Sequence, residues 1–449
     1  MLISKNPEIS LAVVRKKHVK QQLRLLRLSP KACLRGCAIV CVTLSTQLEI
    51  AAHASEFHKV ERLQQRQQEL NLESWQLETH TSELLQRVQS LEALQFAPTT
   101  KLTTEDYFII GGIPNYHQTN GTANNATTFN YDLRLFLDTS YSGRDLLRVR
   151  LRSDNSNDYP FGIDSSNIFK LDKPSSNTAG LRVDRFFYSF PAGDEWKFTV
   201  GALMQINDNY AFKPTVYNAQ IIDLFSLAGA GGVYKQNSGP GFGAIWKQRS
   251  AKGKPYLTAS TSFISTSYGS DSSYGLFDQQ SGLNGTAQLG LRSDNWGIAV
   301  AYRIGTENTR VSVANGAAGT KLGAGQTSNN VAIGGYWQPL KKGWMPSISL
   351  GYGYTQNSTT DNNPPNSQSW ALGLQWSDVL ASGNAAGIGI GQPANATGDG
   401  KKAWLYEIFY RWELTDNIST TAALFLGTNA AQTAEASNLG GVIQTRFRF

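Results

Sequence analysis

The chain has 449 residues, with 41 Lys and Arg against 34 Asp and Glu, which gives a formal net charge of +7. Nine of these basic residues and two of the acidic ones lie in residues 1–54, so the rest of the chain carries 32 of each and is neutral. The same segment holds all three cysteines, at 33, 37 and 41. A positive charge confined to the N-terminus gives no reason to expect a nucleic-acid partner, and the body of the chain has no thiol for a disulfide or for a Cys-ligated metal.

Residues 1–54 are predicted to form a signal peptide with a long basic n-region. Lys31 and Arg35 precede an apolar run at 36–44, and Ala52-His53-Ala54 then supplies a small-x-small cleavage site. A short apolar run after a cationic stretch is typical of an export signal, and the alternative is a buried helix. Cleavage after Ala54 removes every cysteine.

Residues 55–96 are predicted to form a periplasmic coiled-coil helix. The stretch from Glu56 to Gln95 contains no Gly and no Pro. Leucines recur at every seventh position and are the predicted coiled-coil core: Leu63, Leu70, Leu77, Leu84 and Leu91. Such a repeat indicates self-association, although a single amphipathic helix docked on the body is the alternative. The polar residues at the other core positions leave the oligomer number open, and Pro98 begins a linker assigned to 97–106.

Residues 107–449 are predicted to form an all-β transmembrane barrel. In the segment 404–412, for example, Trp404, Tyr406 and Ile408 share one face and Leu405 and Glu407 share the other. Aromatic residues recur at strand ends, while the opposite faces carry Gly, Ala, Ser, Gln and Arg, which make a poor core but a wet lumen. The length fits about 16 antiparallel strands, in a range of about 14 to 18. Closure is expected because an open edge in lipid leaves backbone groups unpaired.

The connections are predicted to alternate between tight turns and long polar loops. Turns are expected at 142–145 and 293–295, and long loops at 153–180, 203–230, 266–282, 305–328, 356–367 and 377–402. The 203–230 loop contains an apolar patch proposed to fold inward as a constriction, with packing on the rim as the alternative: Ile221, Ile222, Asp223, Leu224 and Phe225. The terminal Phe449 is predicted to be the signal read by the barrel-insertion machinery.

One set of arginines is predicted to line the pore, because their positions alternate with those that face lipid: Arg134, Arg148, Arg150, Arg152, Arg446 and Arg448. Closing the barrel brings the first and last strands together, so these residues are candidates for a single basic patch that favours anions. The alternative is that they pair with acids of a folded-in loop, such as Asp154, Asp158 and Asp223, and leave a nearly neutral pore.

An enzyme is not expected. The chain has five His, and only His117 lies in the barrel region. A Ser-His-Asp site would depend on that one residue, and no P-loop, HExxH or CxxC motif is present. The sequence therefore predicts no catalytic residue, no cofactor and no metal site.

Several stretches resemble cyanobacterial outer-membrane porins of the iron-uptake type, which belong with the OprB-like carbohydrate-selective porins. They lie at 93–102, 133–151, 370–376, 383–393 and 406–419. The resemblance implies a homotrimer in the outer membrane that passes small hydrophilic solutes and inorganic ions, iron included. A carbohydrate-selective porin and a structural tether with a plugged barrel are the alternatives. Members of this family usually carry a surface-layer-homology domain before the coiled coil. The helix here begins almost at the predicted cleavage site, so that domain is expected to be absent and contact with peptidoglycan is left open.

Overall fold

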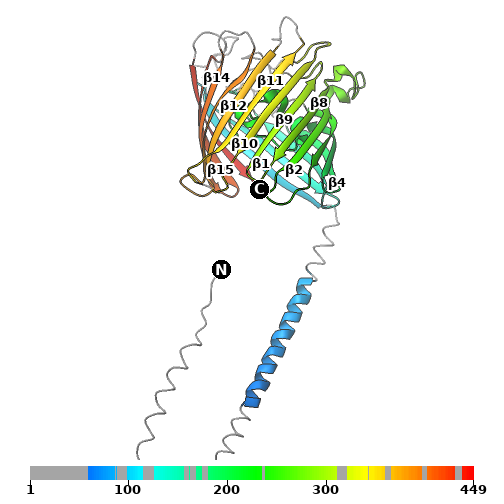
Figure 1. Cartoon of the computed structure of the whole chain (residues 1–449), viewed down its shortest axis with the longest axis vertical. Coiled ribbons are helices and arrows are strands. Elements are labelled where there is room, and N and C mark those ends of the chain that lie inside the picture. The colour runs from blue at the N-terminus through cyan, green and yellow to red at the C-terminus, as the bar shows by residue number, and fades with distance from the viewer. Residues whose placement is uncertain are drawn as a thin grey trace, which may run out of the picture. The chain divides into compact units, whose positions relative to one another are not determined.

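The computed structural model of the chain has two units, residues 1–91 and 92–449, which are described separately (Figure 1). The structure describes residues 59–85, 87, 99–114, 126–155, 161, 168–173, 180–234, 238–310, 321–341, 343–358, 366–396, 402–429 and 437–449. The predicted signal peptide, Leu91, Asp158 and His117 lie outside these ranges.

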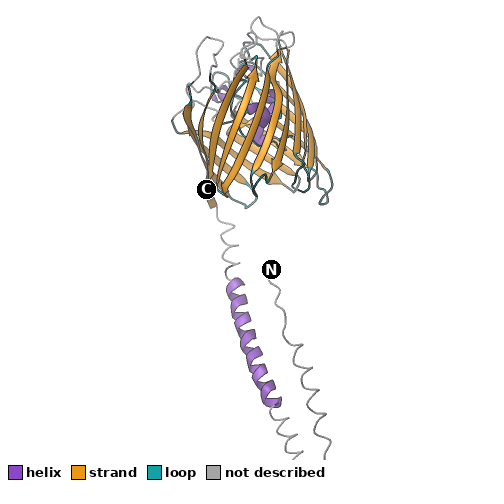
Figure 2. Ribbon diagram, turned by 90° about the vertical axis from the view of Figure 1, so that its left-hand side faces the viewer, coloured by secondary structure: helices purple, strands orange, loops and turns teal. Residues whose placement is uncertain are grey.

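The second unit is a closed barrel of sixteen strands in which each strand pairs with its neighbours in the chain and β1 pairs with β16 (Figures 1 and 2). All of the pairings are antiparallel, which confirms the predicted fold class and strand number. The strands are β1 (Thr99–Gly112), β2 (Thr128–Ser140), β3 (Leu146–Asp154), β4 (Arg182–Ala192), β5 (Trp196–Gln205), β6 (Ser238–Lys247), β7 (Tyr256–Ile264), β8 (Asn284–Arg292), β9 (Trp296–Gly305), β10 (Ser328–Trp337), β11 (Ser347–Asn357), β12 (Asn366–Ser377), β13 (Ala385–Ala396), β14 (Trp404–Thr415), β15 (Ile418–Thr428) and β16 (Ser437–Arg448).

The seam between β1 and β16 closes the barrel. Tyr107 lies opposite Arg446, and Gly112 lies opposite Gly441. Beyond the ladder, the backbone N–H of Thr104 donates to the carbonyl of Phe449 at 2.8 Å, so the last residue is itself tied into the seam. Closure leaves no open strand edge, which is the condition for a sheet to lie in hydrocarbon.

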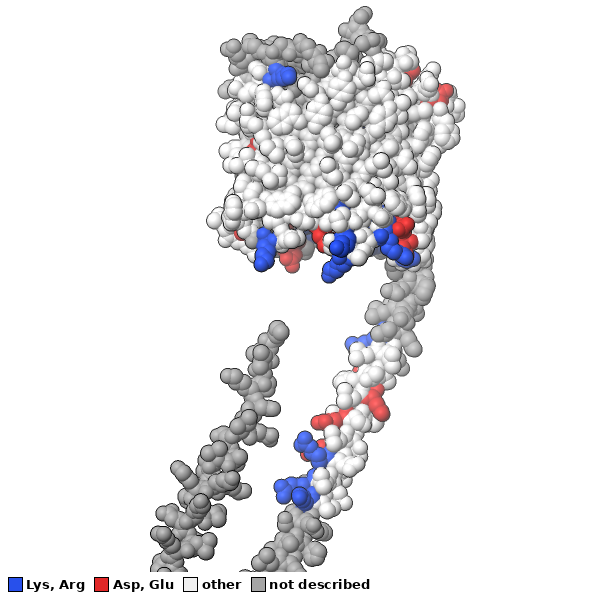
Figure 3. All heavy atoms as spheres, in the orientation of Figure 1, with Lys and Arg blue, Asp and Glu red and all other residues white. Residues whose placement is uncertain are grey.

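Side chains alternate between the two surfaces of the wall as the sequence predicts. On β14, Leu405, Glu407 and Phe409 are buried inside, whereas Tyr406 and Ile408 are exposed on the outside. Figure 3 shows the visible outer wall almost free of charged residues over most of its height, with charges gathered at the end where the C-terminus lies. An apolar belt between polar rims is the surface that a barrel presents to a bilayer.

The connections differ at the two ends of the barrel. At one end, here called the turn end, they run over 141–145, 193–195, 248–255, 293–295, 338–346, 378–384 and 416–417, and they include both predicted turns. At the other, the loop end, they run over 113–127, 155–181, 206–237, 265–283, 306–327, 358–365, 397–403 and 429–436.

Two sequence assignments need correction. The predicted loop 377–402 contains β13, which the sequence hides because small residues alternate there with only Ile388 and Ile390 as large apolar side chains. The predicted linker 97–106 is mostly strand, because β1 begins at Thr99.

The turn between β2 and β3 shows how local chemistry sets these ends. The Asp145 carboxylate accepts hydrogen bonds from the backbone N–H groups of Tyr141 and Ser142 at 3.0 and 2.7 Å, and from the Ser140 hydroxyl at 2.7 Å. The hydroxyl of Tyr188 on β4 donates to it as well, at 2.7 Å, and these bonds hold the pKa of Asp145 well below its usual range. The carboxylate stays charged and fixes the turn.

The connection between β5 and β6 enters the barrel; we call residues 206–234 the inner loop. It contains two one-turn helices, α2 (Asp223–Ser226) and α3 (Gly231–Tyr234), which lie inside the cylinder in Figure 2. The apolar residues of the inner loop pack with those of the 155–181 connection and with the wall from β12 round to β1. Part of the lumen is therefore filled by protein.

The described part of the first unit is a helix over residues 59–85. Its heptad leucines at 63, 70, 77 and 84 are each more than half exposed, so the apolar seam has no partner within the described part of this unit. The helix agrees with the sequence prediction, whereas its pairing into a coiled coil stays a prediction. No described helix is long and apolar enough to cross a membrane.

We expect Gly373→Val to displace the inner loop. A Cβ at Gly373 would lie 2.5 Å from the Tyr217 ring, so the ring has to move, at a cost of about 1–3 kcal/mol. The measurement is the unfolding temperature in detergent together with the rate at which protease cuts within 206–234. Gly343→Val is the matched control, because a Cβ there meets nothing within 4 Å. Equal behaviour of the two variants would contradict this packing.

Candidate functional site

The inner loop is held by polar side chains that project from the inside of the wall. On β8, the Gln288 amide donates to the carbonyl of Phe212 at 3.0 Å. On β11, the Ser349 hydroxyl accepts from the N–H of Val216 at 2.9 Å. On β12, the Gln375 amide oxygen accepts from the N–H of residue 218 at 2.7 Å. Each bond satisfies a backbone group of the loop, so the loop crosses the lumen at a defined height.

Glu407 on β14 holds the loop at its far end. Its side chain, 2% exposed, accepts from the hydroxyl of Tyr217 at 2.7 Å and from the N–H of Ile222 at 3.0 Å. The rings of Tyr217, Phe225 and Phe409 pack together beside it. A carboxylate in apolar surroundings requires such partners, and the sequence gave no signal for them because they come from a loop almost two hundred residues away.

The tip of the inner loop pairs with the connection between β3 and β4. Leu171 and Ile222 form an antiparallel bridge. The N–H of Asp172 donates to the carbonyl of Ile221 at 2.7 Å, and the N–H of Asp223 donates to the carbonyl of Lys170 at 2.9 Å. The four candidate constriction residues, at 221, 222, 223 and 225, thus lie inside the barrel and are buried. Their effect on the bore stays a prediction.

The loop returns across the lumen and is held a second time by Arg303 on β9. This arginine is fully buried; its guanidinium donates to the Asn284 amide oxygen at 2.9 Å, to the carbonyl of Gly232 at 2.9 Å and to the carbonyl of Arg310 at 3.0 Å. A buried cation is tolerated when its donors are used in this way. Sequence reasoning placed Arg303 on the inward face but assigned it no role.

The predicted arginines of β2 and β3 lie together on the inside of the wall, where they form a ladder of ion pairs. Arg148 donates through two nitrogens to Asp138 at 2.8 and 2.7 Å. Arg150 does the same to Asp184 of β4 at 2.6 and 2.7 Å. Forked guanidinium–carboxylate pairs of this kind are strong and directional.

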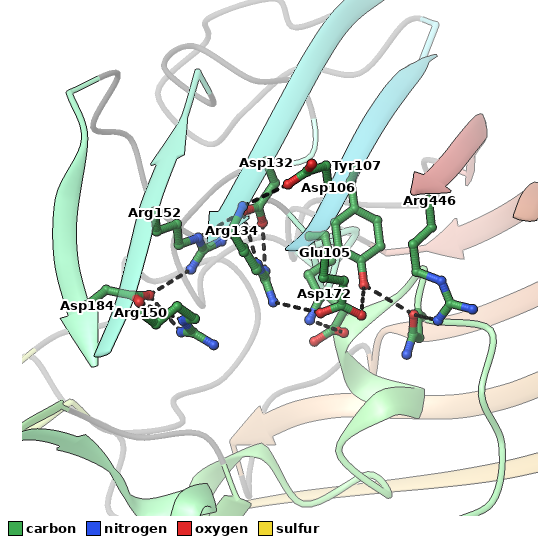
Figure 4. A network of polar contacts seen from close by, with 12 residues as sticks. Glu105, Asp106, Tyr107, Asp132, Arg134, Arg150, Arg152, Asp172, Asp184 and Arg446 are labelled. Atoms are coloured by element: carbon green, nitrogen blue, oxygen red, sulfur yellow. Dashed lines mark hydrogen bonds and ion pairs between the residues drawn. The ribbon is translucent and has the colours of Figure 1, made fainter. Parts of the chain in front are cut away.

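Asp132 completes the ladder, with two arginines on one carboxylate (Figure 4). Arg134 donates to it at 3.0 and 2.6 Å, and Arg152 donates to it at 2.9 and 2.6 Å. All three side chains are buried. The register explains the arrangement, because Arg134 lies opposite Arg152 on β3 and Asp132 lies opposite Asp154. The partner acids are strand residues, so the predicted basic patch is largely neutralised by its own wall.

The acids predicted as loop partners behave differently from that expectation. Asp154 belongs to β3, where its Oδ2 is 3.6 Å from both Arg152 and Arg182. Asp223 bonds within the paired loops through its backbone N–H.

A second group of charges lies beside the ladder, at the seam. The hydroxyl of Tyr107 donates to Glu105 at 2.7 Å, and Lys173 lies 3.3 Å from Asp172 and over the ring of Tyr107. Burial lowers the pKa of Lys173 to about 8, and the nearby Arg134 lowers it further. Lys173 is therefore a cation at neutral pH that loses its proton in mildly alkaline solution.

The two remaining predicted arginines lie on β16 near the turn end. Arg446 donates to the side chain of Gln220 at 3.3 Å, at the tip of the inner loop. Both Arg446 and Arg448 lie near Glu413 of β14, at 4.0 and 3.6 Å. They are separate from the ladder, so closure of the barrel does not unite the six arginines into one patch. Among the described residues, no group of three His, Cys, Asp or Glu is placed to hold a metal ion.

No family model matches the chain. Two proteins described as uncharacterized are similar to it over most of its length. One, from Nostoc sp., is 26% identical over 418 residues, which cover 86% of this chain and 72% of the relative. The other, from Synechocystis sp., is 24% identical over 423 residues, which cover 85% of this chain and 75% of the relative. Among solved structures, OprB of Pseudomonas putida superposes with a TM-score of 0.52 at 11% identity, over 80% of this chain and 96% of OprB. That likeness shows a shared porin fold.

We expect Asp132→Asn to destabilise the barrel more than Asp138→Asn does. Asp132 neutralises two buried guanidinium groups, and removing a buried partner costs on the order of 3 kcal/mol. The pair of Asp138 and Arg148 is partly exposed, so its loss costs about 0–1 kcal/mol. The measurement is the unfolding temperature of the refolded protein in detergent. A loss that is equal in both variants would show that the shared carboxylate has no special role.

Proposed function

We propose that the protein is a passive outer-membrane channel, and not an enzyme, that admits small hydrophilic solutes and inorganic ions, iron included. The observation that carries the proposal is a closed sixteen-strand barrel with an apolar outside and an inner wall of ion pairs. Side chains of this ladder keep exposed area inside the barrel, up to a third for Arg148. A charged, partly accessible interior suits a water-filled path, whereas a barrel that only anchors needs no such wall.

Several parts of the proposal go beyond the barrel fold. The turn end faces the periplasm, and Phe449, which is exposed at that end, serves as the insertion signal. The channel is a homotrimer, which general porin architecture supports. A carbohydrate-selective channel is the alternative for the solute, in line with the likeness to OprB.

One observation favours a second function, a structural tether with a plugged barrel. The inner loop and the 155–181 connection fill part of the lumen with a shared apolar core. Conductance distinguishes a partial filling from a complete plug.

We expect purified protein in a planar bilayer to give unitary currents that rise with salt concentration. The near-neutral ladder predicts weak charge selectivity, read as a small reversal potential across a salt gradient. Inserted protein that carries no current would contradict the channel and favour the tether. Envelope blebbing in a deletion strain would support the tether independently.

We further propose that the helix of residues 59–85 pairs through its exposed leucines into a periplasmic coiled coil. We expect Leu70→Asp to lower the oligomeric state or the thermal stability of the oligomer, because it places a charge in the apolar seam. The control is Gln65→Asp, on the polar face of the same helix. Cross-linking and light scattering give the measurement, and unchanged oligomers in Leu70→Asp would contradict the pairing.

A further inference from the structure

Three arginines near the turn end of the lumen gather around one carboxylate. Arg411 and Glu413 lie on β14, and Arg446 and Arg448 lie on β16, all on the inward face. The Nε of Arg411 is 3.7 Å from Glu413, and the Nη2 atoms of Arg446 and Arg448 are 4.0 and 3.6 Å from it. The group is here called the arginine triad.

The triad differs from the ladder in how its donors are used. Each ladder arginine places two nitrogens within 3.0 Å of an aspartate, whereas every triad nitrogen named above lies beyond hydrogen-bonding distance of Glu413. The Nη1 of Arg411 donates to the carbonyl of Asn218 at 3.0 Å, and the Nη1 of Arg446 donates to Gln220 at 3.3 Å. The Nε of Arg411 is buried with no acceptor among the described residues. A guanidinium carries five N–H donors, so most of those in the triad face the lumen without a protein acceptor.

The charges of the triad are also unbalanced. Three guanidinium groups and one carboxylate leave a local excess of two positive charges, while the four arginines of the ladder share Asp132, Asp138 and Asp184 and lie near further acids. An oxyanion between the guanidinium forks would supply both the missing charge and the missing acceptors.

We propose that Arg411, Arg446 and Arg448 form a binding subsite for small oxyanions of the inorganic phosphate type. The subsite lies on the periplasmic side of the inner-loop tip, because Asn218 and Gln220 of that tip bond to two of the three arginines. The inference rests on the proposed channel and deepens it: the anion site is the triad, and the ladder that the sequence favoured is a neutral wall.

The first test is a titration of inorganic phosphate into chloride currents through single channels at constant ionic strength. We expect phosphate to interrupt or reduce the current of the wild type. Arg411→Gln with Arg446→Gln weakens the apparent affinity by at least about tenfold, as the loss of charge-assisted hydrogen bonds predicts. Glu413→Gln removes the competing carboxylate, so it strengthens the phosphate effect; a purely structural role for Glu413 would not produce that sign. Arg249→Gln, an exposed change in the turn between β6 and β7, leaves the phosphate effect unchanged.

A second readout does not depend on conduction. Phosphate that binds the folded barrel raises its unfolding temperature in detergent relative to chloride at equal ionic strength. We expect this rise in the wild type and its loss in the double variant. Protein that carries no current but keeps the phosphate-dependent rise would contradict the channel and retain the subsite. If phosphate changes neither current nor unfolding temperature, or if Arg148→Gln abolishes its effect while the triad variants keep it, the subsite is wrong.

Discussion

Every backbone N–H and C=O group in a hydrocarbon layer needs a partner within the protein, and the rest of this structure depends on that constraint. The wall satisfies it by pairing β1 with β16 and by tying the carbonyl of Phe449 to Thr104. The same constraint operates a second time inside the barrel. The inner loop has little regular structure, so its backbone bonds to Ser349, Gln375 and Glu407, which the strands project at the required height.

The interior is consequently divided between two kinds of surface. From β12 round to β1 the wall is apolar and is covered by the inner loop and its neighbour. On β2 to β4 it is charged, and its charges are matched across the ladder by register, as in the pairing of Asp138 opposite Arg148. Adjacent strands of the same wall thus cancel one another, and a net charge persists only where strands contribute arginines without an equal number of acids. In the described lumen that condition is met around Glu413.

Much of the barrel could be predicted from sequence because period-two alternation is a local signal. Trp404 and Tyr406 against Leu405 show it directly, and burial agrees. The signal fails where side chains are small, which is why β13 was taken for a loop. The site was harder for a different reason: whether Arg152 meets Asp132 or a loop acid depends on register, which the sequence does not state. The arginines were placed on the correct face, but their partners were not, and Arg411 was passed over because it belongs to a different strand pair.

The path of the inner loop has a mechanical consequence. The loop bonds to β8, β11, β12 and β14 on its way out and to β9 on its return, so it spans the cylinder between strands that are not neighbours. A thin-walled tube flattens easily unless something crosses its interior, and here the crossing element is the one that narrows the bore. The loop therefore acts as a cross-brace, and any deformation of the barrel outline is transmitted to its tip.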